Sequence, residues 1–179
     1  MKPGQRGAIA EAAIAFEAIK LHIGVFRPLT EARYDLIFDT GSRLFRVQCK
    51  SAARQGDVVV IRCRSCRRSR DGYVRRVYTR EEVDLVAAYC HDTGSSYLLQ
   101  PDVFEGRSAL QLRLAPSKNN QRLGVNWAAD FEFAATLSAL GAIAQLGERL
   151  RGTQEVGGSS PPGSTSRGIA DGPSRIVPD

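Results

Sequence analysis

Two short apolar runs separated by a turn signal constrain the fold of this chain more than any other feature. Leu36-Ile37-Phe38 forms the first run, residues 44–50 alternate apolar and polar side chains, and Gly41-Ser42 lies between them. This pattern predicts a β-hairpin. Side chains two positions apart share one face of a strand, so one set should enter a core. The expected core set is Phe45, Val47 and Cys49, and the expected opposite set is Arg46, Gln48 and Lys50.

The polar residues of this hairpin suit the cleavage of a phosphodiester. Asp35 stands at the start of the first run, and Gln48 and Lys50 lie two positions apart on the second. The hairpin would bring a carboxylate, a carboxamide oxygen and an ammonium to one place. Mg²⁺ prefers hard oxygen ligands, and held between Asp35 and Gln48 it would lie close to Lys50. The pattern therefore indicates metal-assisted hydrolysis.

This order of residues, Asp-x12-Gln-x-Lys after a helical glutamate, resembles the PD-(D/E)XK nuclease superfamily. The Gln-x-Lys variant is similar to that of small homing endonucleases associated with group I introns. The resemblance covers roughly residues 1–133. The segments that carry it are Gly7–Glu11, Tyr34–Leu36, Val47–Lys50, Val83–Val86 and Ser117–Gln121.

The resemblance implies a restriction-endonuclease-like α/β core with an Mg²⁺ site, for which Mn²⁺ is an alternative ion. Asp35 would be the principal metal ligand, with Gln48 and Glu11 as further ligands. The backbone carbonyl of Cys49 could add another oxygen. Lys50 would orient or deprotonate the attacking water, or stabilise the transition state. Because Gln48 replaces the carboxylate that most relatives carry, the number of metal ions per site stays open.

Each of these residues taken alone also fits a structural role. Asp35 could end a strand, and Glu11 could lie on a helix surface. Gln48 and Lys50 could face solvent from an edge strand. Their occurrence together in the family's order favours the active-site interpretation. Asp84 lies inside an apolar run and is interpreted as a buried acid that accepts backbone hydrogen bonds.

The segment from Arg62 to Arg80 is the most basic part of the chain, with eight arginines. Asp71 is its single acid, and the whole chain carries a net charge of +6. Arginine makes bidentate contacts to phosphates and guanine edges, so this segment is expected to contact DNA rather than only to be solvated. Arg46 could touch DNA or pair with Glu11 or Asp35. The residues expected to bind DNA are Arg46, Arg64, Arg67, Arg68, Arg70, Arg75 and Arg76.

The remaining pattern predicts an α/β fold in which helices flank a mixed central sheet. A first helix should bury the stripe Ile9, Ala12, Phe16, Ile19 and Ile23 and should stop at Gly24. A second hairpin is expected from Val58–Cys63 and Tyr73–Tyr78, with the basic segment as the loop between its strands. Further strands are expected at Val83–Cys90, Tyr97–Gln100 and Leu110–Leu114, and a last core helix at Trp127–Leu140.

The four cysteines allow two interpretations. Reduced thiols, with Cys49 and Cys90 packed in a core, are the first. Cys63 and Cys66 have the spacing of half a zinc ribbon, and a structural zinc would need two ligands from elsewhere.

Residues 1–140 are expected to form the endonuclease domain and residues 141–179 a flexible tail. The tail contains Gly157–Ser164, a polar segment typical of disorder. Ala142–Arg149 and Glu155–Pro161 resemble open frames across the D-arm and T-arm of a tRNA gene. The tail is therefore interpreted as a possible translated tRNA-gene segment.

The sequence favours a Mg²⁺-dependent, site-specific DNA endonuclease of homing or intron-associated type. A junction resolvase or a restriction-type nuclease on the same fold is the alternative enzyme, and a non-catalytic DNA-binding module is the alternative outside enzymes. The expected partners are double-stranded DNA and further copies of the chain, as a dimer or tetramer. With no apolar run of about 18–20 residues and no apolar N-terminal segment, a prokaryotic intracellular, nucleoid-associated location is expected, without a membrane partner.

Overall fold

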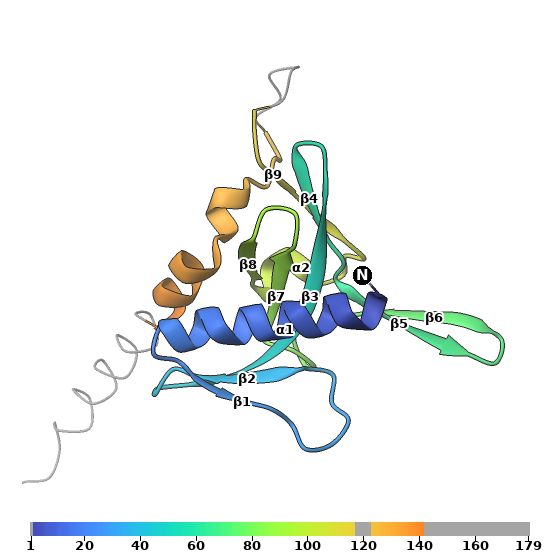
Figure 1. Cartoon of the computed structure of the whole chain (residues 1–179), viewed down its shortest axis with the longest axis horizontal. Coiled ribbons are helices and arrows are strands. Elements are labelled where there is room, and N and C mark those ends of the chain that lie inside the picture. Colours follow the sequence, from blue (N-terminus) through green and yellow to red (C-terminus); the bar gives the residue numbers. More distant parts are fainter. Residues whose placement is uncertain (1, 117–122, 142–179) are drawn as a thin grey trace, which may run out of the picture.

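The computed structural model describes residues 2–116 and 123–141 (Figure 1). In chain order the elements are α1 (Pro3–Lys20), β1 (Gly24–Phe26), β2 (Leu36–Asp39), β3 (Leu44–Gln55), β4 (Val58–Ile61), β5 (Arg64–Ser69), β6 (Gly72–Val77), β7 (Leu85–Cys90), β8 (Ser95–Leu99), α2 (Pro101–Phe104), β9 (Leu110–Arg113) and the 3₁₀ helix η1 (Ala128–Phe131). Residues 133–141 are also helical. Helices lie against a mixed sheet, so the predicted α/β class is confirmed. The segment Ser117–Gln121 and the proposed tail, apart from Gly141 at the end of the last helix, lie outside the described residues.

The long strand β3 organises the sheet. It pairs antiparallel with β2 over Leu44–Val47 and with β4 over Ala53–Gln55, and parallel with β7 over Val47–Ala52. Among the described residues, positions 48–52 pair with β7 alone, so the other edge of β3 is open between β2 and β4. The predicted first hairpin is confirmed as β2–β3, and its turn has Gly41 at φ 83°. A positive φ of this kind favours glycine.

One face of the sheet packs against α1 and the helix of residues 133–141. Ile14 and Ala18 from α1 are buried with Phe38 from β2 and with Phe133 and Leu137 from the last helix. The rings of Phe38 and Phe133 meet edge to face, with centroids 6.1 Å apart, which is a favoured aromatic arrangement. The residues of β3 expected in the core belong to the same cluster, namely Phe45, Val47 and Cys49.

The opposite face is covered by β4, β9 and α2. Val59 and Leu112 from the β4–β9 pair, with Phe104 from α2, are buried against Val86 and Ala88 of β7. Burial of side chains of this size stabilises the fold by ~1.5–3 kcal/mol each. The second alternating set of β3, which contains Gln48 and Lys50, lies on this side of the sheet.

The predicted buried stripe of α1 is wrong. The helix turns Ala10, Ile14 and Ala18 toward the sheet, all of them at most 1% exposed, whereas Phe16 and Ile19 are 60% and 58% exposed. Small alanines allow the helix backbone to approach the sheet closely, so the inner face is not the one with the largest apolar residues.

The first helix also ends earlier than predicted. His22 adopts a left-handed conformation (φ 60°), and the N–H groups of His22 and Ile23 donate to the carbonyls of Ile19 and Ala18. This is a Schellman ending with histidine in place of glycine. Gly24 instead lies in β1, where an added Cβ would come within 3.2 Å of the Asp39 Cβ.

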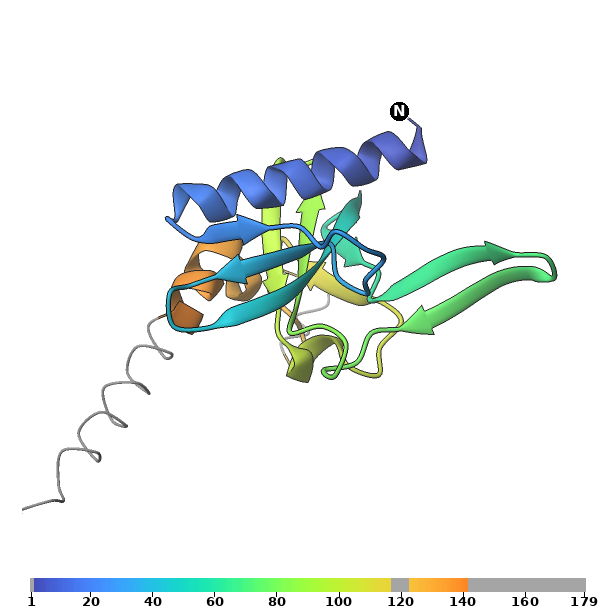
Figure 2. The same cartoon turned by 90° about the horizontal axis from the view of Figure 1, so that it is seen from below.

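The predicted second hairpin is also wrong in its pairing. Val58–Ile61 joins β3 through the turn at Gly56 (φ 59°) and pairs with β9 on its other edge. The basic segment, expected as a loop, is itself a hairpin of β5 and β6 that projects from the body (Figure 2). Its turn precedes Gly72, at φ 124°. Two glycine turn signals, Gly56-Asp57 and Asp71-Gly72, thus define two hairpins.

The later elements follow the predictions more closely. Strands β7, β8 and β9 confirm the three predicted runs: β7 and β9 are shorter than predicted, and β8 begins two residues earlier and ends one residue earlier. The predicted helix at Trp127–Leu140 is divided into η1 and the helix of residues 133–141. Glu132 separates them because its backbone bridges to Tyr97 and its carboxylate accepts the N–H of Ala135 at 2.9 Å, as an N-cap does.

Candidate active site

The open edge of β3 is occupied by the carboxylate of Asp35. The Asp35 N–H donates to the Val47 carbonyl at 2.9 Å, which extends the β2–β3 ladder by one bond. The next β3 donor on this edge, the Cys49 N–H, donates to the Asp35 carboxylate at 2.8 Å. Asp35, which directly precedes β2, therefore has its carboxylate fixed against the middle of β3.

Gln48 lies beside Asp35 and is only 8% exposed. Its amide N–H₂ donates to the Asp35 carboxylate and, at 3.2 Å, to the carbonyl of Cys49. A side-chain donor thus sits between two oxygens that both attract positive charge. The structure brings together Asp35, Gln48 and the Cys49 carbonyl, the three groups expected around a metal.

Lys50 lies two positions after Gln48 on β3, on the same face of the strand. Its ammonium donates to the Tyr78 hydroxyl at 2.6 Å and lies 4.7 Å from the centre of that ring. Burial lowers the pKa of Lys50, while the charge of Asp35 opposes the shift. Burial also raises the pKa of Tyr78 to about 12, so its hydroxyl keeps its proton at neutral pH and can hold the lysine in place.

Glu11 lies on α1, within range of the charge of Asp35. Burial raises its pKa, the nearby charge of Asp35 adds to the effect, and Arg27 opposes it. The Arg27 guanidinium lies 3.2 Å from the Glu11 carboxylate. Burial raises the pKa of Asp35 too, although the Cys49 N–H and the Lys50 charge act against the shift. Both carboxylates thus have raised pKa values, and Glu11 lies close enough to Asp35 for the charge of Asp35 to act on it.

These residues fit a hard divalent cation. A cation with oxygen ligands would relieve the repulsion between Glu11 and Asp35, and the Gln48 carboxamide can present its oxygen by rotating. Across residues 2–116 and 123–141, no three His, Cys, Asp or Glu side chains gather at one point. A cation bound here would therefore need the amide of Gln48 or the backbone carbonyl of Cys49 as a further ligand, and this ligand set stays a prediction.

Arg46 does not join this cluster. Its guanidinium donates to the Asp84 carboxylate at 3.0 and 3.1 Å and to the carbonyl of Glu81 at 2.5 Å. The expected pairing with Glu11 or Asp35 is therefore wrong, and DNA contact by Arg46 stays a prediction. Asp84 also accepts the Arg46 N–H at 2.8 Å, which confirms it as a structural acid.

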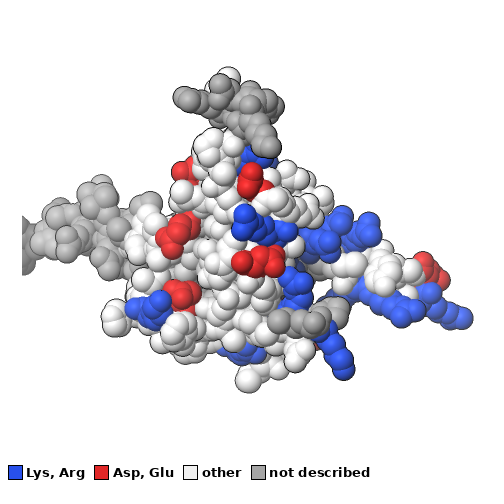
Figure 3. Space-filling model, turned by 45° about the horizontal axis from the view of Figure 1, so that its top comes forward, with Lys and Arg blue, Asp and Glu red and all other residues white. Residues whose placement is uncertain are grey.

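The other predicted DNA-binding arginines lie on the β5–β6 hairpin, where basic side chains gather (Figure 3). Arg64, Arg68 and Arg75 share one face of it, Arg67 and Arg76 lie on the other, and Arg70 is in the turn. Arg76 pairs with Glu82, and Arg67 lies 3.6 Å from Glu31. Their contact with DNA remains a prediction.

Two residues that sequence reasoning missed connect the hairpin to the site. Arg33 donates to the Ser65 hydroxyl at 2.8 Å and to Glu82 at 3.2 Å, and its guanidinium lies 4.7 Å from the centre of the Tyr78 ring. Tyr78 in turn holds Lys50. Neither residue belongs to a recognisable sequence motif, because each acts through a tertiary contact.

The cysteines are free thiols, with Cys49, Cys63 and Cys90 buried and Cys66 exposed. Burial raises the pKa of Cys63 to about 11, which favours a packing role. The zinc interpretation gains no ligand cluster within the described part of the chain.

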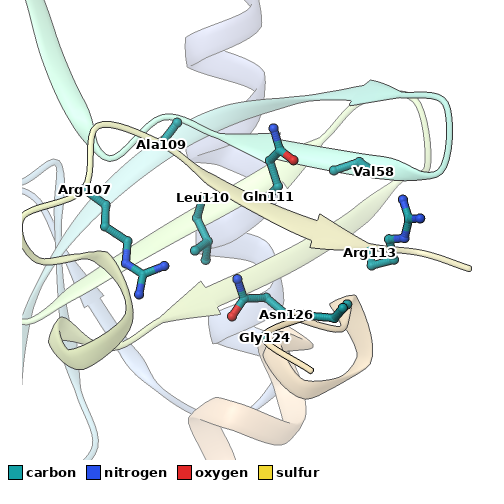
Figure 4. Close-up of a pocket in the computed structure, with 9 residues that line it drawn as sticks. Val58, Arg107, Ala109, Leu110, Gln111, Arg113, Gly124 and Asn126 are labelled. Carbon is teal, nitrogen blue, oxygen red and sulfur yellow. The ribbon is translucent and has the colours of Figure 1, made fainter. Parts of the chain in front are cut away.

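A pocket of about 310 Å³ lies elsewhere, beside β9. Arg107, Gln111, Arg113 and Asn126 are among its lining residues, which include none of the four predicted catalytic residues. The side chains of Arg107 and Gln111 extend to different sides of β9 (Figure 4), so their polar groups do not converge.

A sequence model of the PD-(D/E)XK endonuclease family matches residues 1–134. Among solved structures, the fold is similar to that of a bacterial homing endonuclease, I-Ssp6803I, with 26% sequence identity and a TM-score of 0.63. That similarity covers 84% of this chain and 99% of the other. No curated protein sequence matches the chain. In the described residues, no helix is long and apolar enough to cross a bilayer.

Proposed function

Because the chain belongs to the PD-(D/E)XK endonuclease family, whose nucleases generally use divalent metals, we propose that it is a Mg²⁺-dependent, site-specific DNA endonuclease of the homing, intron-associated type. The observation that carries the proposal is the contact of Gln48 and the Cys49 N–H with the Asp35 carboxylate at the open edge of β3, near enough to Lys50 for its charge to lower the Asp35 pKa. Residues 1–140 form the catalytic domain in this proposal, which the family match over residues 1–134 supports.

Asp35, Gln48, Glu11 and the Cys49 carbonyl would hold Mg²⁺ or Mn²⁺. The bound ion supplies Lewis-acid activation of water and offsets charge on the scissile phosphate. Asp35 is held in place by the Cys49 N–H, so the site is partly organised before the ion arrives. Gln48 contributes a neutral oxygen, which leaves Glu11 and Asp35 as the two carboxylates.

Lys50 would orient the attacking water, or take its proton, beside the phosphate. A lowered pKa makes an amine a better base near neutral pH, while the charged form would stabilise the transition state. Tyr78 keeps its proton and fixes the position of the lysine in either case. The basic hairpin lies beside this region and offers arginines for phosphate contact.

Cleavage of a plasmid tests the proposal. Purified protein is incubated with a plasmid carrying the uninterrupted host locus, for which an intron-free tRNA gene is the first choice, in Mg²⁺ or in EDTA. Discrete products are expected from wild type in Mg²⁺ alone, and none from Asp35→Ala or Lys50→Ala. Retained DNA binding without any metal-dependent cleavage by the wild type would refute the enzymatic assignment.

A further inference from the structure

Helix α1 is apolar on two faces, and the sheet uses one of them. The inner face buries Ala10, Ile14 and Ala18. The outer face carries Ile9 at 41%, Phe16 at 60% and Ile19 at 58% exposure. Figures 1 and 2 show α1 on the outside of the molecule. A helix that is apolar on opposite sides is usually buried on both, so the outer face calls for a partner.

The outer residues follow the spacing of a helix–helix contact. Ile9, Ala12, Phe16 and Ile19 are separated by three, four and three positions. This is the a/d seam of a heptad, the pattern by which two helices pack side by side. Scattered apolar residues on a surface need no explanation, but a continuous seam along one helix does.

The charges near the seam indicate an apolar partner. The four seam residues are uncharged, and the neighbouring Lys20 pairs with Glu17 at 3.2 Å while its ammonium lies 5.5 Å from the centre of the Phe16 ring. The arginines gather on the β5–β6 hairpin instead (Figure 3). DNA is therefore a poor occupant of this face.

The seam is complementary to itself when two copies run antiparallel. Ile9 then faces the partner's Ile19, and Ala12 faces the partner's Phe16. The large ring fits over the small methyl, and the two-fold axis repeats each contact. Ala8, Ala13 and Ala15 flank the seam and allow the helices to approach closely.

We propose that the outer face of α1, formed by Ile9, Ala12, Phe16 and Ile19, is the surface through which two copies of this chain associate, with their α1 helices antiparallel. A helix of 18 residues is about 27 Å long. One such contact lies at the small end of stable interfaces, so the dimer depends on concentration. Glu11 lies off the seam, and the candidate active site stays open in the dimer.

Sedimentation of the full chain without DNA tests the surface. Wild type is expected to sediment at multiples of 19.5 kDa that shift with concentration. Phe16→Glu should raise the dimer dissociation constant by at least about 30-fold. Leu44→Glu is the matched control, because Leu44 is also 60% exposed but lies on β3. Circular dichroism confirms that both variants are folded.

Disulfide trapping tests the orientation in a Cys66→Ser background. Mixing Ile9→Cys with Ile19→Cys protein should give a cross-linked pair, whereas each variant alone should not. The inference is overturned if the wild type stays monomeric up to a protein concentration of about 100 μM. It is also overturned if Phe16→Glu leaves the assembly unchanged. Cross-linking of Ile9→Cys with itself overturns the antiparallel arrangement. Neither measurement reads nuclease activity, so failure here is distinct from failure of the proposed function.

Discussion

Asp35 and Asp84 stand on opposite edges of β3 and make the same backbone contact. Each carboxylate accepts a β3 N–H at 2.8 Å, from Cys49 and Arg46 respectively. Their pKa values nevertheless move in opposite directions. Burial raises the pKa of Asp35. Burial acts on Asp84 as well, but the hydrogen bonds and charge of Arg46 outweigh it and lower the pKa.

The difference lies in the nearest cation. Asp84 receives the Arg46 guanidinium directly, whereas the Lys50 ammonium is bonded to Tyr78 rather than to Asp35. The charge of Asp35 also contributes to the raised pKa of a second acid, Glu11. A satisfied ion pair stabilises the fold, whereas a half-buried carboxylate without a directly bonded cation is available for a metal ion. The comparison separates an acid held in an ion pair from the one that would bind the metal in the proposed function, and the two lie beside opposite edges of β3.

The strongest test exchanges both acids for amides. Asp35→Asn should reduce the single-turnover rate of DNA cleavage by at least about 10³-fold, because it removes a charged metal ligand. Asp84→Asn should keep the wild-type rate per folded molecule at a temperature where it is folded. Equal losses from the two variants would contradict the division of roles.

The next effect is on stability. Asp84→Asn should lower the free energy of unfolding by about 2 kcal/mol, since it leaves the Arg46 guanidinium without its charged acceptor. Urea denaturation followed by circular dichroism measures the change. Glu31→Gln is a suitable control, because Glu31 is 91% exposed in its pair with Arg67 and such pairs contribute little.

Much of this comparison could be predicted from the sequence, because it depends on local order. The alternation along β3 and the position of Asp35 before an apolar run placed the polar groups on the expected side, and the apolar surroundings of Asp84 indicated a buried acid. Tyr78 and Arg33 could not be predicted, since their roles depend on a hairpin folding back beside β3. The face of α1 was misjudged because apolar periodicity does not tell which of two apolar faces meets the sheet.

Removal of the Tyr78 hydroxyl should have a smaller effect than loss of Asp35. Tyr78→Phe keeps the ring but removes the acceptor for the Lys50 ammonium, so the maximal cleavage rate should fall about tenfold with little change in KM. Tyr97→Phe is the matched control, because Tyr97 is also buried, at 4% exposure. A change in KM with an unchanged maximal rate would argue against positioning of the lysine.

The smallest effect should be a gain in stability at the candidate site. The pKa of Asp35 in the folded state lies above its ordinary value of 3.8, so the ionised carboxylate disfavours folding at neutral pH. The penalty is absent below pH 3.8 and develops as pH rises through the folded-state pKa. Without metal at pH 7, Asp35→Asn should therefore raise the melting temperature by about 2–4 °C.

Substitution of Asp84 should change the melting temperature in the opposite direction. Its lowered pKa means that its contribution is present above pH 3.8 and is lost as pH falls through the folded-state value. At pH 7, Asp35→Asn should raise the melting temperature and Asp84→Asn should lower it. Both differences from wild type should become smaller in acid. A loss of stability in Asp35→Asn at pH 7 would mean that the hydrogen bonds of the carboxylate with Cys49 and Gln48 outweigh the cost of burying its charge. Asp35 would then be a structural acid like Asp84.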